Sequence, residues 1–417
     1  MPSMLYLDAA RMGRMAPTAQ LALQDFVRVA GEEGCTLYFE RFLKDGFSAW
    51  PSRLQDRLPG LRSWGGVAEL KDAIVRTLGL LPKTPSLLAG RSTNLATLAA
   101  KWLFEGERRI LITDLTWPSY RRILQRESRK SRGYIEFIRI RSAILHRKIE
   151  AQSLIDILAD RLNETHCDGL FLPEISHDGV RLPIPGIIQA VRRIRESSRV
   201  VVDGSQAFGQ IPLHLSEIPC DFYLAGCHKW LGSHLPLGVG AFPNPETNQE
   251  LHRLAVRWFE NAKLDDPLAT FLHRLETGRW RRFSETVNLS PLFACRGALE
   301  DMDGDAFQQR LANARLVRRI APMTGWTPLD PCEAFRSATV LLQGDVATTK
   351  ESSPMELRDR FHARDVALTS YENGLIRLSM PSNPLSQFEA GRLIQALALV
   401  QVRAECVARP EGELAYA

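Results

Sequence analysis

Strand-like and helix-like segments alternate through the middle of the chain. Short apolar runs predict strands over 109–114, 134–140, 169–176, 199–205 and 221–230, and apolar residues at helical spacing predict helices over 118–127, 152–163 and 187–197. This alternation is typical of βαβ units, so we expect an α/β fold with a mostly parallel sheet. Such sheets bind their ligands at the carboxyl ends of the strands.

The pattern changes after about residue 300. It predicts a long amphipathic helix over 305–321, strands over 337–344 and 374–381, and a final helix over 386–402. These elements predict a second, smaller α+β domain. We therefore expect an N-terminal segment, 1–65, that contributes to both domains, a large domain over 66–295 and a small C-terminal domain over 296–417.

Length and composition are those of a globular protein with two cores. The chain has 417 residues, of which 45% are hydrophobic and 24% charged. No apolar run approaches the length of a membrane span, and the first ten residues lack the features of a secretory signal. The seven cysteines show no CxxC pairing, which argues against a disulfide framework and a zinc site. We expect a protein of the reducing cytoplasm that holds no metal.

Positive charge is concentrated in one segment. Residues 121–148 carry ten Lys or Arg against Glu127 and Glu136, a local charge of +8, whereas the whole chain is +5. A basic stripe can bind nucleic acid or an acidic carrier. Such a run is more often a solvated helix face, and no nucleic-acid-binding motif accompanies it. We therefore expect no nucleic-acid partner.

Two chemically active residues lie at predicted strand ends, 26 positions apart. Asp203 closes the strand "RVVVD", and Lys229 follows the apolar run "DFYLAGCH". A lysine amine can attack a carbonyl and hold it as an imine, and a carboxylate that faces a pyridine nitrogen keeps that nitrogen protonated. The two residues could thus serve pyridoxal phosphate (PLP). A lysine at a strand end is more often a surface cation, so the pair alone is weak evidence.

The sequence around the pair is more specific. "VVVDGSQAFGQIPL" and "DFYLAGCHKWLGSHLPLGVGAF" resemble the class V aminotransferase group of fold-type I PLP enzymes, which includes cysteine desulfurases and isopenicillin N epimerase-like enzymes. The elements that match are Asp203, Gln206, His228-Lys229 and Gly238/Gly240. The resemblance extends from "LYLDAA" to "IRLSMPSNPLSQFE". It implies a large domain with a mostly parallel, seven-stranded sheet and a smaller C-terminal domain.

The resemblance implies that PLP is the cofactor and gives the matching residues their roles. Lys229 would form the Schiff base and carry protons, and Asp203 would pair with the pyridinium nitrogen. Gln206 would face the phenolic oxygen of PLP, and His228 would lie by its phosphate.

Five further residues are implied to contact the cofactor. "LLAGRSTN" resembles the phosphate-binding loop of the family, with Ser92 and Thr93 as donors at a helix N-terminus. Trp117 would stack on the pyridine ring, unless it is a core tryptophan. Ser176 would reach the cofactor or the substrate, unless it only forms a turn. Thr286 in "FSETVNLSP" resembles the segment that reaches the neighbouring subunit's phosphate, so a homodimer is implied.

Arginines mark the expected substrate side. Arg377 stands where the family commonly holds the substrate α-carboxylate, a task that suits a permanently charged, bidentate guanidinium, although a salt bridge is the alternative. Arg11 is a candidate for reading a second acidic or polar group. The other cations that could do so are Arg14, Arg279, Arg281 and Arg282, and solvated loop arginines are an equal alternative.

The chain also departs from the family pattern. Gly226 replaces a serine that often contacts the phosphate, and Glu285 replaces a glycine. No cysteine lies between Cys332 and Arg377, where a desulfurase needs a mobile nucleophile, so a cysteine desulfurase is disfavoured. Cys227, beside His228, is more consistent with a small buried residue than with an activated thiol.

The reaction that follows removal of the Cα proton stays open. We expect an aminotransferase first, with a lyase, cyclase or epimerase of specialised amino-acid metabolism as the alternative. A non-catalytic binding module that uses the basic segment is disfavoured by the intact Asp203, Gln206, His228 and Lys229 set. An oxidoreductase on a Rossmann sheet is set aside because no GxGxxG follows the first strand.

Overall fold

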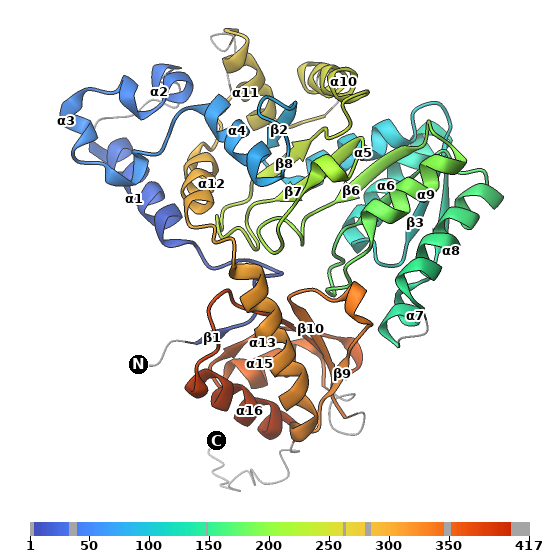
Figure 1. Ribbon diagram of the computed structural model, residues 1–417. Coiled ribbons are helices and arrows are strands. Elements are labelled where there is room, and N and C mark those ends of the chain that lie inside the picture. The colour runs from blue at the N-terminus through green and yellow to red at the C-terminus, as the bar shows by residue number, and fades with distance from the viewer. Residues whose placement is uncertain are drawn as a thin grey trace, which may run out of the picture.

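A seven-stranded sheet forms the centre of the computed structural model, which describes residues 4–32, 40–146, 149–261, 264–279, 285–345 and 352–401 (Figure 1). Its strands lie in the order β2-β8-β7-β6-β5-β3-β4. Their bounds are β2 Ser86–Ala89, β3 Arg109–Thr113, β4 Tyr134–Ile138, β5 Gly169–Pro173, β6 Arg199–Asp203, β7 Phe222–Gly226 and β8 Gly238–Ala241. β8 runs antiparallel to both of its neighbours, β2 and β7, and the other neighbouring pairs are parallel. The predicted mostly parallel sheet is therefore confirmed.

Helices cover both faces of this sheet. Their bounds are α4 Val67–Thr77, α5 Ser92–Leu103, α6 Pro118–Ser131, α7 Arg141–Leu145, α8 Ala151–Glu164, α9 Ile184–Ile194, α10 Asn248–Glu260, α11 Pro267–Glu276 and α12 Ser290–Glu300. The three helices predicted between the strands are confirmed as α6, α8 and α9.

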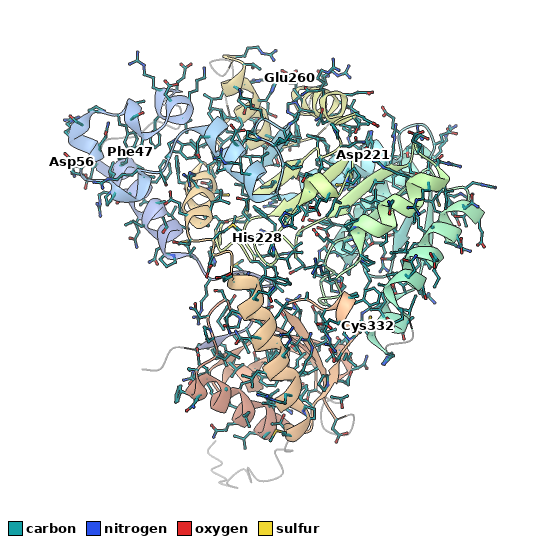
Figure 2. The ribbon with its side chains drawn as sticks, in the orientation of Figure 1. Phe47, Asp56, Asp221, His228, Glu260 and Cys332 are labelled. Carbon is teal, nitrogen blue, oxygen red and sulfur yellow. The ribbon has the colours of Figure 1, made fainter. Side chains whose placement is uncertain are left out.

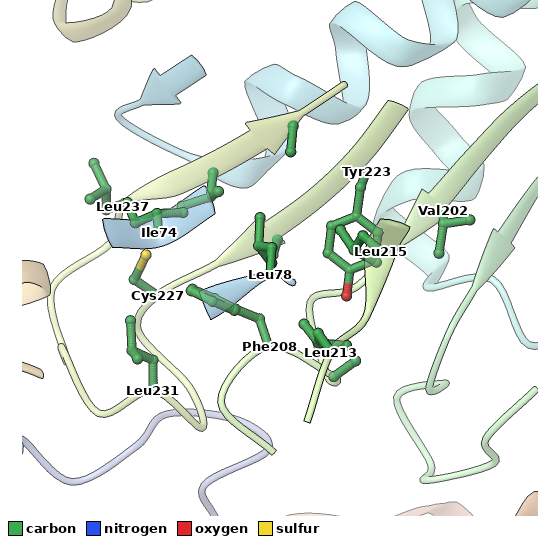
Figure 3. Close-up of a cluster of buried hydrophobic side chains, with 14 of the residues drawn as sticks. Ile74, Leu78, Val202, Phe208, Leu213, Leu215, Tyr223, Cys227, Leu231 and Leu237 are labelled. Carbon is green, nitrogen blue, oxygen red and sulfur yellow. The ribbon is translucent and has the colours of Figure 1, made fainter. Parts of the chain in front are cut away.

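Strand alternation explains why each central strand is apolar throughout. Successive side chains of β6 point to opposite faces, so Val201 joins the core beneath α5, whereas Val200 and Val202 join the core beneath α9. Figure 3 shows part of the second core, where Val202 lies beside Tyr223 of β7. Burial on both faces is what a parallel sheet in an α/β layer requires.

The strand expected over 221–230 is shorter than predicted. β7 ends at Gly226, and the amide of Cys227 donates to the carbonyl of Leu237, which begins the return toward the antiparallel β8. Gly232 has a φ of 81°, a left-handed conformation that the reversal uses. Lys229 therefore lies in a turn beyond the strand end, not on the strand itself.

A smaller antiparallel sheet lies below the large one in Figure 1. Its order is β12-β13-β10-β9, with β9 Thr327–Leu329, β10 Thr339–Gln343, β12 Thr369–Tyr371 and β13 Leu375–Ser379. The helices of this part are α13 Ala306–Ile320, α15 Pro354–His362 and α16 Gln387–Gln401. They share a separate hydrophobic core that includes Trp326 and Phe361. The predicted α+β character of the C-terminal part is confirmed.

The N-terminal segment lies against both parts. β1 (Leu5–Tyr6) pairs in parallel with β11 (Val366–Ala367), and α1 (Pro17–Glu32) packs on α12. Two short helices, α2 (Glu40–Asp45) and α3 (Ser52–Gln55), follow it. The 3-10 turns are Phe47–Ala49, Pro59–Leu61, Leu215–Glu217, Ala321–Thr324, Glu333–Phe335 and Glu372–Gly374. The domain boundaries at 65 and 295 stay a prediction.

In the described part of the chain, no helix combines the length and the apolar character that crossing a bilayer would need.

Candidate active site

A cavity of about 590 Å³ opens where the large sheet, the small sheet and the N-terminal segment meet. The carboxyl ends of β5, β6 and β7 form one side of it, β12 and β13 another, and the N-termini of α5 and α6 a third. The predicted residues that line it are Arg11, Ser92, Thr93, Trp117, Asp203, Gln206, His228, Lys229 and Arg377. Ser176 and Thr286 are not among its lining residues.

Asp203 ends β6 between two parallel neighbours. It is paired in register with Pro173 of β5 and Leu224 of β7, and it is only 5% exposed. Burial raises the pKa of its carboxyl, while the hydrogen bonds from Ser205 and the charge of Lys229 act in the opposite direction. The carboxylate is therefore held in a dry environment where a cationic partner is strongly favoured.

Lys229 projects into the same cavity from the turn after β7. Burial lowers its pKa to about 8, Asp203 raises it, and Arg377 lowers it further. A substantial fraction of the amine is therefore neutral and nucleophilic near pH 8, which is what a carbonyl-attacking lysine needs. The turn is closely packed, because a Cβ on Gly13 would lie 1.9 Å from the Lys229 carbonyl oxygen.

The N-terminus of α5 and the His228 ring form a cradle for an anion. Ser92 Oγ accepts a hydrogen bond from Tyr120 Oη at 2.9 Å, and the first amides of a helix are free to donate to a ligand. His228 Nδ1 is buried and has no hydrogen-bond partner among the described residues. Figure 2 shows His228 at the end of the large sheet that faces the smaller one. An orphaned ring nitrogen beside a helix N-terminus fits a phosphate group.

The cradle also explains the glycine at 226. A Cβ there would lie 3.0 Å from Cε1 and 3.1 Å from Nδ1 of His228, so the imidazole fills the space that a serine side chain would need. A Cβ on Gly238 would lie 2.8 Å from the Ser92 amide nitrogen, so a side chain on β8 would push into the loop. At Gly226 the His228 imidazole therefore takes the place of the serine side chain that the family often has.

Asp266 holds the phosphate-binding loop in place, and no sequence motif pointed to it. Its carboxylate accepts hydrogen bonds from the Gly90 amide at 2.9 Å, from Asn94 Nδ2 at 2.7 Å and from the Ala269 amide at 2.9 Å. The last of these caps the N-terminus of α11. One buried carboxylate thus ties the loop before α5 to the start of a helix that follows much later in the chain.

Gln206 lines the cavity, but hydrogen bonds within the protein occupy both ends of its amide. Nε2 donates to the Ala10 carbonyl at 2.8 Å, and Oε1 accepts from Trp230 Nε1 at 2.8 Å. Arg310 lies over the Trp230 ring at 5.6 Å and donates to the carbonyls of Gly209 and Gln210. Nε2 keeps a second N–H, so these bonds still allow the expected contact of Gln206 with the phenolic oxygen, which stays a prediction.

Trp117 and Ser176 differ in where the structure places them. Trp117 lines the cavity, is 41% exposed, and packs edge-on against the His177 ring at 5.1 Å, so it is not a core tryptophan. Ser176 is 1% exposed, accepts a hydrogen bond from the Val180 amide and donates to Asp178. Ser176 has the surroundings of a turn serine, which was the alternative to a cofactor contact, because its hydroxyl forms hydrogen bonds within the loop.

His177, the next residue, reaches the cavity instead, and sequence reasoning missed it. Its Nδ1 is buried without a hydrogen-bond partner among the described residues. Burial lowers the pKa of His177, while the nearby Asp178 raises it. The signal that could have found it is its place directly after the predicted strand end at 176.

The surroundings of Arg377 include the salt bridge that was its alternative explanation, and its expected contact with the substrate α-carboxylate stays a prediction. Arg377 lines the cavity, and it is also salt-bridged, with Nη2 3.3 Å from Asp8 Oδ1. Nη1 donates to the His177 carbonyl at 2.7 Å, and Nη2 donates to Thr369 Oγ1 at 3.0 Å. Arg377 is only 3% exposed, and these bonds hold its guanidinium in one orientation.

The remaining arginines expected on the substrate side differ in whether they reach the cavity. Arg11 lines the cavity, whereas Arg14 donates to the Met4 carbonyl and lies over Tyr6 at 5.1 Å. Arg279 is paired with Glu260 at 2.8 Å. Arg281 and Arg282 lie outside the described residues. Thr286 is exposed on the surface. Only Arg11 of the described members of this set therefore reaches the cavity.

Several cations of the basic segment have acidic partners. Glu127 is buried and pairs with Arg126 and Lys130, and Arg141 pairs with Asp178. Arg121 lies over the Phe137 ring at 5.7 Å. The last two residues of the segment, 147 and 148, lie outside the described part. Part of the charge excess thus has a structural explanation within the α6 and β4 region.

Cys227 is buried beside the lysine, as the sequence reasoning expected. It is fully buried, and its Sγ lies 3.6 Å from Sγ of Cys295 on α12. The hydrogen bond between the thiols and burial together raise the pKa of Cys227 well above its usual value. An activated thiolate at this position is therefore not supported.

Comparison with known proteins agrees with this geometry. The family description "Aminotransferase class-V" matches residues 89–253. Isopenicillin N epimerase of Amycolatopsis lactamdurans is 30% identical over 168 residues, which cover 38% of this chain and 40% of that protein. An L-cysteine desulfhydrase-like protein of Epichloe uncinata is 29% identical over 82 residues, covering 20% of this chain and 17% of that one. The chain thus spans less than half the length of these curated relatives.

The fold likeness is more extensive. A C-DES variant with glycine covalently linked to its PLP cofactor superposes with a TM-score of 0.67 at 14% identity, over 95% of this chain and 96% of that one. This likeness covers both the large sheet and the small one. The sequence match over residues 89–253 and the likeness of the fold over most of the chain agree with the resemblance to the class V aminotransferase group, and the fold is that of the fold-type I, PLP-dependent enzymes.

Proposed function

We propose that this protein acts on an amino acid through Lys229 and that it is most simply an aminotransferase. The observation that carries the proposal is the meeting of Asp203 and Lys229, from the ends of adjacent strands, in one cavity with Arg377. PLP, when bound, supplies an electron sink that stabilises negative charge at the substrate Cα. The protein's own residues must bind the cofactor, orient the substrate and move the proton.

Each polar wall of the cavity has a part in this proposal. Asp203 holds a proton near the ring nitrogen, and Ser92, Thr93 and His228 receive the phosphate. Lys229, with a pKa of about 8, can both accept and return a proton near neutral pH. Trp117, which directly precedes α6, would stack on the ring.

The substrate lies on the Arg377 side of the cavity in this proposal. Arg377 binds the α-carboxylate, and Arg11 reads a second acidic or polar group. Arg11 has no ion pair or hydrogen bond recorded for its side chain among the described residues, so its charge is available to a ligand. Arg11→Ala should then change the preference among amino acids. An unchanged preference would contradict this part of the proposal.

An epimerase or lyase is the second candidate. The specific observation in its favour is the match to isopenicillin N epimerase, the longer of the two sequence matches. The three reactions share removal of the Cα proton and differ in where the next proton goes or which bond breaks. That difference depends on placement to within about an ångström.

The test is the visible spectrum of the purified protein with individual amino acids, compared with Lys229→Ala. Loss of the cofactor band with one amino donor, together with a new keto acid, supports an aminotransferase. Ammonia or an inverted Cα configuration supports a lyase or an epimerase instead. A wild-type protein that takes up no PLP would contradict the whole proposal.

A homodimer belongs to the proposal as well. Thr286 is exposed and lies outside the cavity of its own chain, which is compatible with a contact to the cofactor phosphate of a partner. Mixing Thr286→Ala chains with Lys229→Ala chains tests it. If Thr286 serves the partner site, each hybrid dimer keeps one site that lacks neither residue, so PLP binding there should be of wild-type strength.

A further inference from the structure

The carboxylate-binding arginine already has a carboxylate beside it. Arg377 Nη2 lies 3.3 Å from Asp8 Oδ1 and 3.0 Å from Thr369 Oγ1. Thr369 Oγ1 in turn donates to the same oxygen of Asp8. The three side chains form a closed set that joins the segment after β1 to β12 and β13.

Burial makes this set electrostatically strong. The Arg377 side chain is 4% exposed and that of Asp8 10% exposed. Solvent therefore screens the pair weakly, and the negative charge of Asp8 opposes the field that Arg377 projects into the cavity.

Arg377 nevertheless keeps donors for a ligand. A guanidinium has five N–H groups, and the recorded hydrogen bonds go to the His177 carbonyl, Thr369 and Asp8. Its Nε is buried and has no partner among the described residues. Arg377 lines the cavity, whereas Asp8 is not among the lining residues. A ligand carboxylate can thus bind Arg377 without displacing Asp8. It would then be attracted by Arg377 and repelled by Asp8.

We propose that Asp8 is a specificity-determining residue that weakens the affinity of Arg377 for carboxylates. The proposal rests on the proposed function, because it deepens the role of Arg377. With Asp8 in place, a simple organic anion gains little from the site. An amino acid binds because its amine adds a second attachment at the cofactor. The cavity also contains Arg11, Arg91 and Lys229, so without Asp8 it would be a general anion trap.

The test measures the binding of propionate and of propionamide, its uncharged counterpart, to the holoenzyme by calorimetry. Asp8→Asn keeps the size and removes the charge, and it should bind propionate about tenfold more tightly with propionamide unchanged. Thr369→Val is the matched control, because it removes the two hydrogen bonds of the Thr369 hydroxyl and leaves both charges. It should change propionate binding by less than about threefold.

A purely structural role for Asp8 predicts that Asp8→Asn does not tighten propionate binding. If Asp8 only orients Arg377, then Asp8→Asn weakens propionate binding or leaves it unchanged, and either result overturns the proposal. Asp8→Ser is a second neutral variant for the case in which Asp8→Asn does not fold. A protein that holds no PLP would contradict the proposed function, whereas the calorimetric comparison of Asp8 variants would still be readable.

Discussion

Tyr223 on β7 donates a hydrogen bond from its hydroxyl to Glu174 Oε2 at 2.7 Å. Glu174 also donates its amide to the Asp203 carbonyl at 2.9 Å. A Cβ on Gly204 would lie 1.9 Å from the Tyr223 hydroxyl, so this pair fills the space next to the expected pyridine partner. Burial raises the pKa of Glu174 to about 7, and the Tyr223 hydrogen bond and Arg181 oppose the rise.

Glu174→Gln should therefore alter how stability depends on pH. A carboxyl whose pKa is raised on folding favours the folded state below its unfolded pKa, and the benefit is lost as pH rises through the folded value. We expect the free energy of unfolding of the wild type to fall by about 3 kcal/mol between pH 4.5 and pH 8 because of this group. The glutamine variant should lack that component in urea unfolding curves.

Tyr223→Phe is the control for that experiment. It removes the donor that stabilises the charged carboxylate, so the pH-dependent loss of stability should persist and grow. Identical pH profiles for wild type and Glu174→Gln would show that Glu174 does not titrate in this range.

The pKa of Lys229 should respond in opposite directions to two neighbouring charges. Asp203→Asn removes an anion that raises this pKa, so the value should fall below about 8. Arg377→Gln removes a cation that lowers it, so the value should rise. The measurement is the pH dependence of the rate at which the cofactor-free protein captures PLP. Arg91→Gln, which removes another cation that lines the cavity, is the control. Shifts of the Lys229 pKa in the same direction in Asp203→Asn and Arg377→Gln would contradict this arrangement of charges.

Gly226 and His228 should prove energetically coupled. Gly226→Ser places a side chain against the His228 ring and should weaken PLP binding about tenfold, since overpacking of this kind costs about 1–3 kcal/mol. In a His228→Ala background the same substitution should cost much less, because the space is then free. A double-mutant cycle on PLP affinity measures the coupling. Additive effects would mean that the two side chains do not compete.

Asp266 should matter for both stability and cofactor binding. Asp266→Ala leaves the Gly90 amide and the α11 N-terminus without their acceptor, and we expect a loss of about 2–4 kcal/mol in unfolding free energy. The α5 N-terminus should loosen, so PLP should dissociate faster. Asp265→Ala, at the exposed neighbour, is the control and should stay within about 0.5 kcal/mol of the wild type. A similar loss in both variants would point to a general effect on the loop.

The order and type of the central elements could be predicted from the sequence. Strands such as β6 are apolar on both faces and are short, and helices such as α9 repeat apolar residues at 3.6-residue spacing, so each is encoded within its own segment. The residues that carry chemistry were also visible, because Asp203 and Lys229 follow such segments in a recognisable pattern. What failed locally was the end of β7, where a turn glycine at 232 decides the path.

The contacts that tune the site came only from the tertiary structure. Asp8 and Arg377 are 369 residues apart, Asp266 and Gly90 are 176 apart, and Glu174 and Tyr223 are 49 apart. No local periodicity records such pairs, because each depends on which chain segments the folded sheets bring together. The amino-acid sequence by itself determined the elements and the reactive groups. Packing decided which charge faces which, because buried electrostatic interactions depend on distances that only the fold sets.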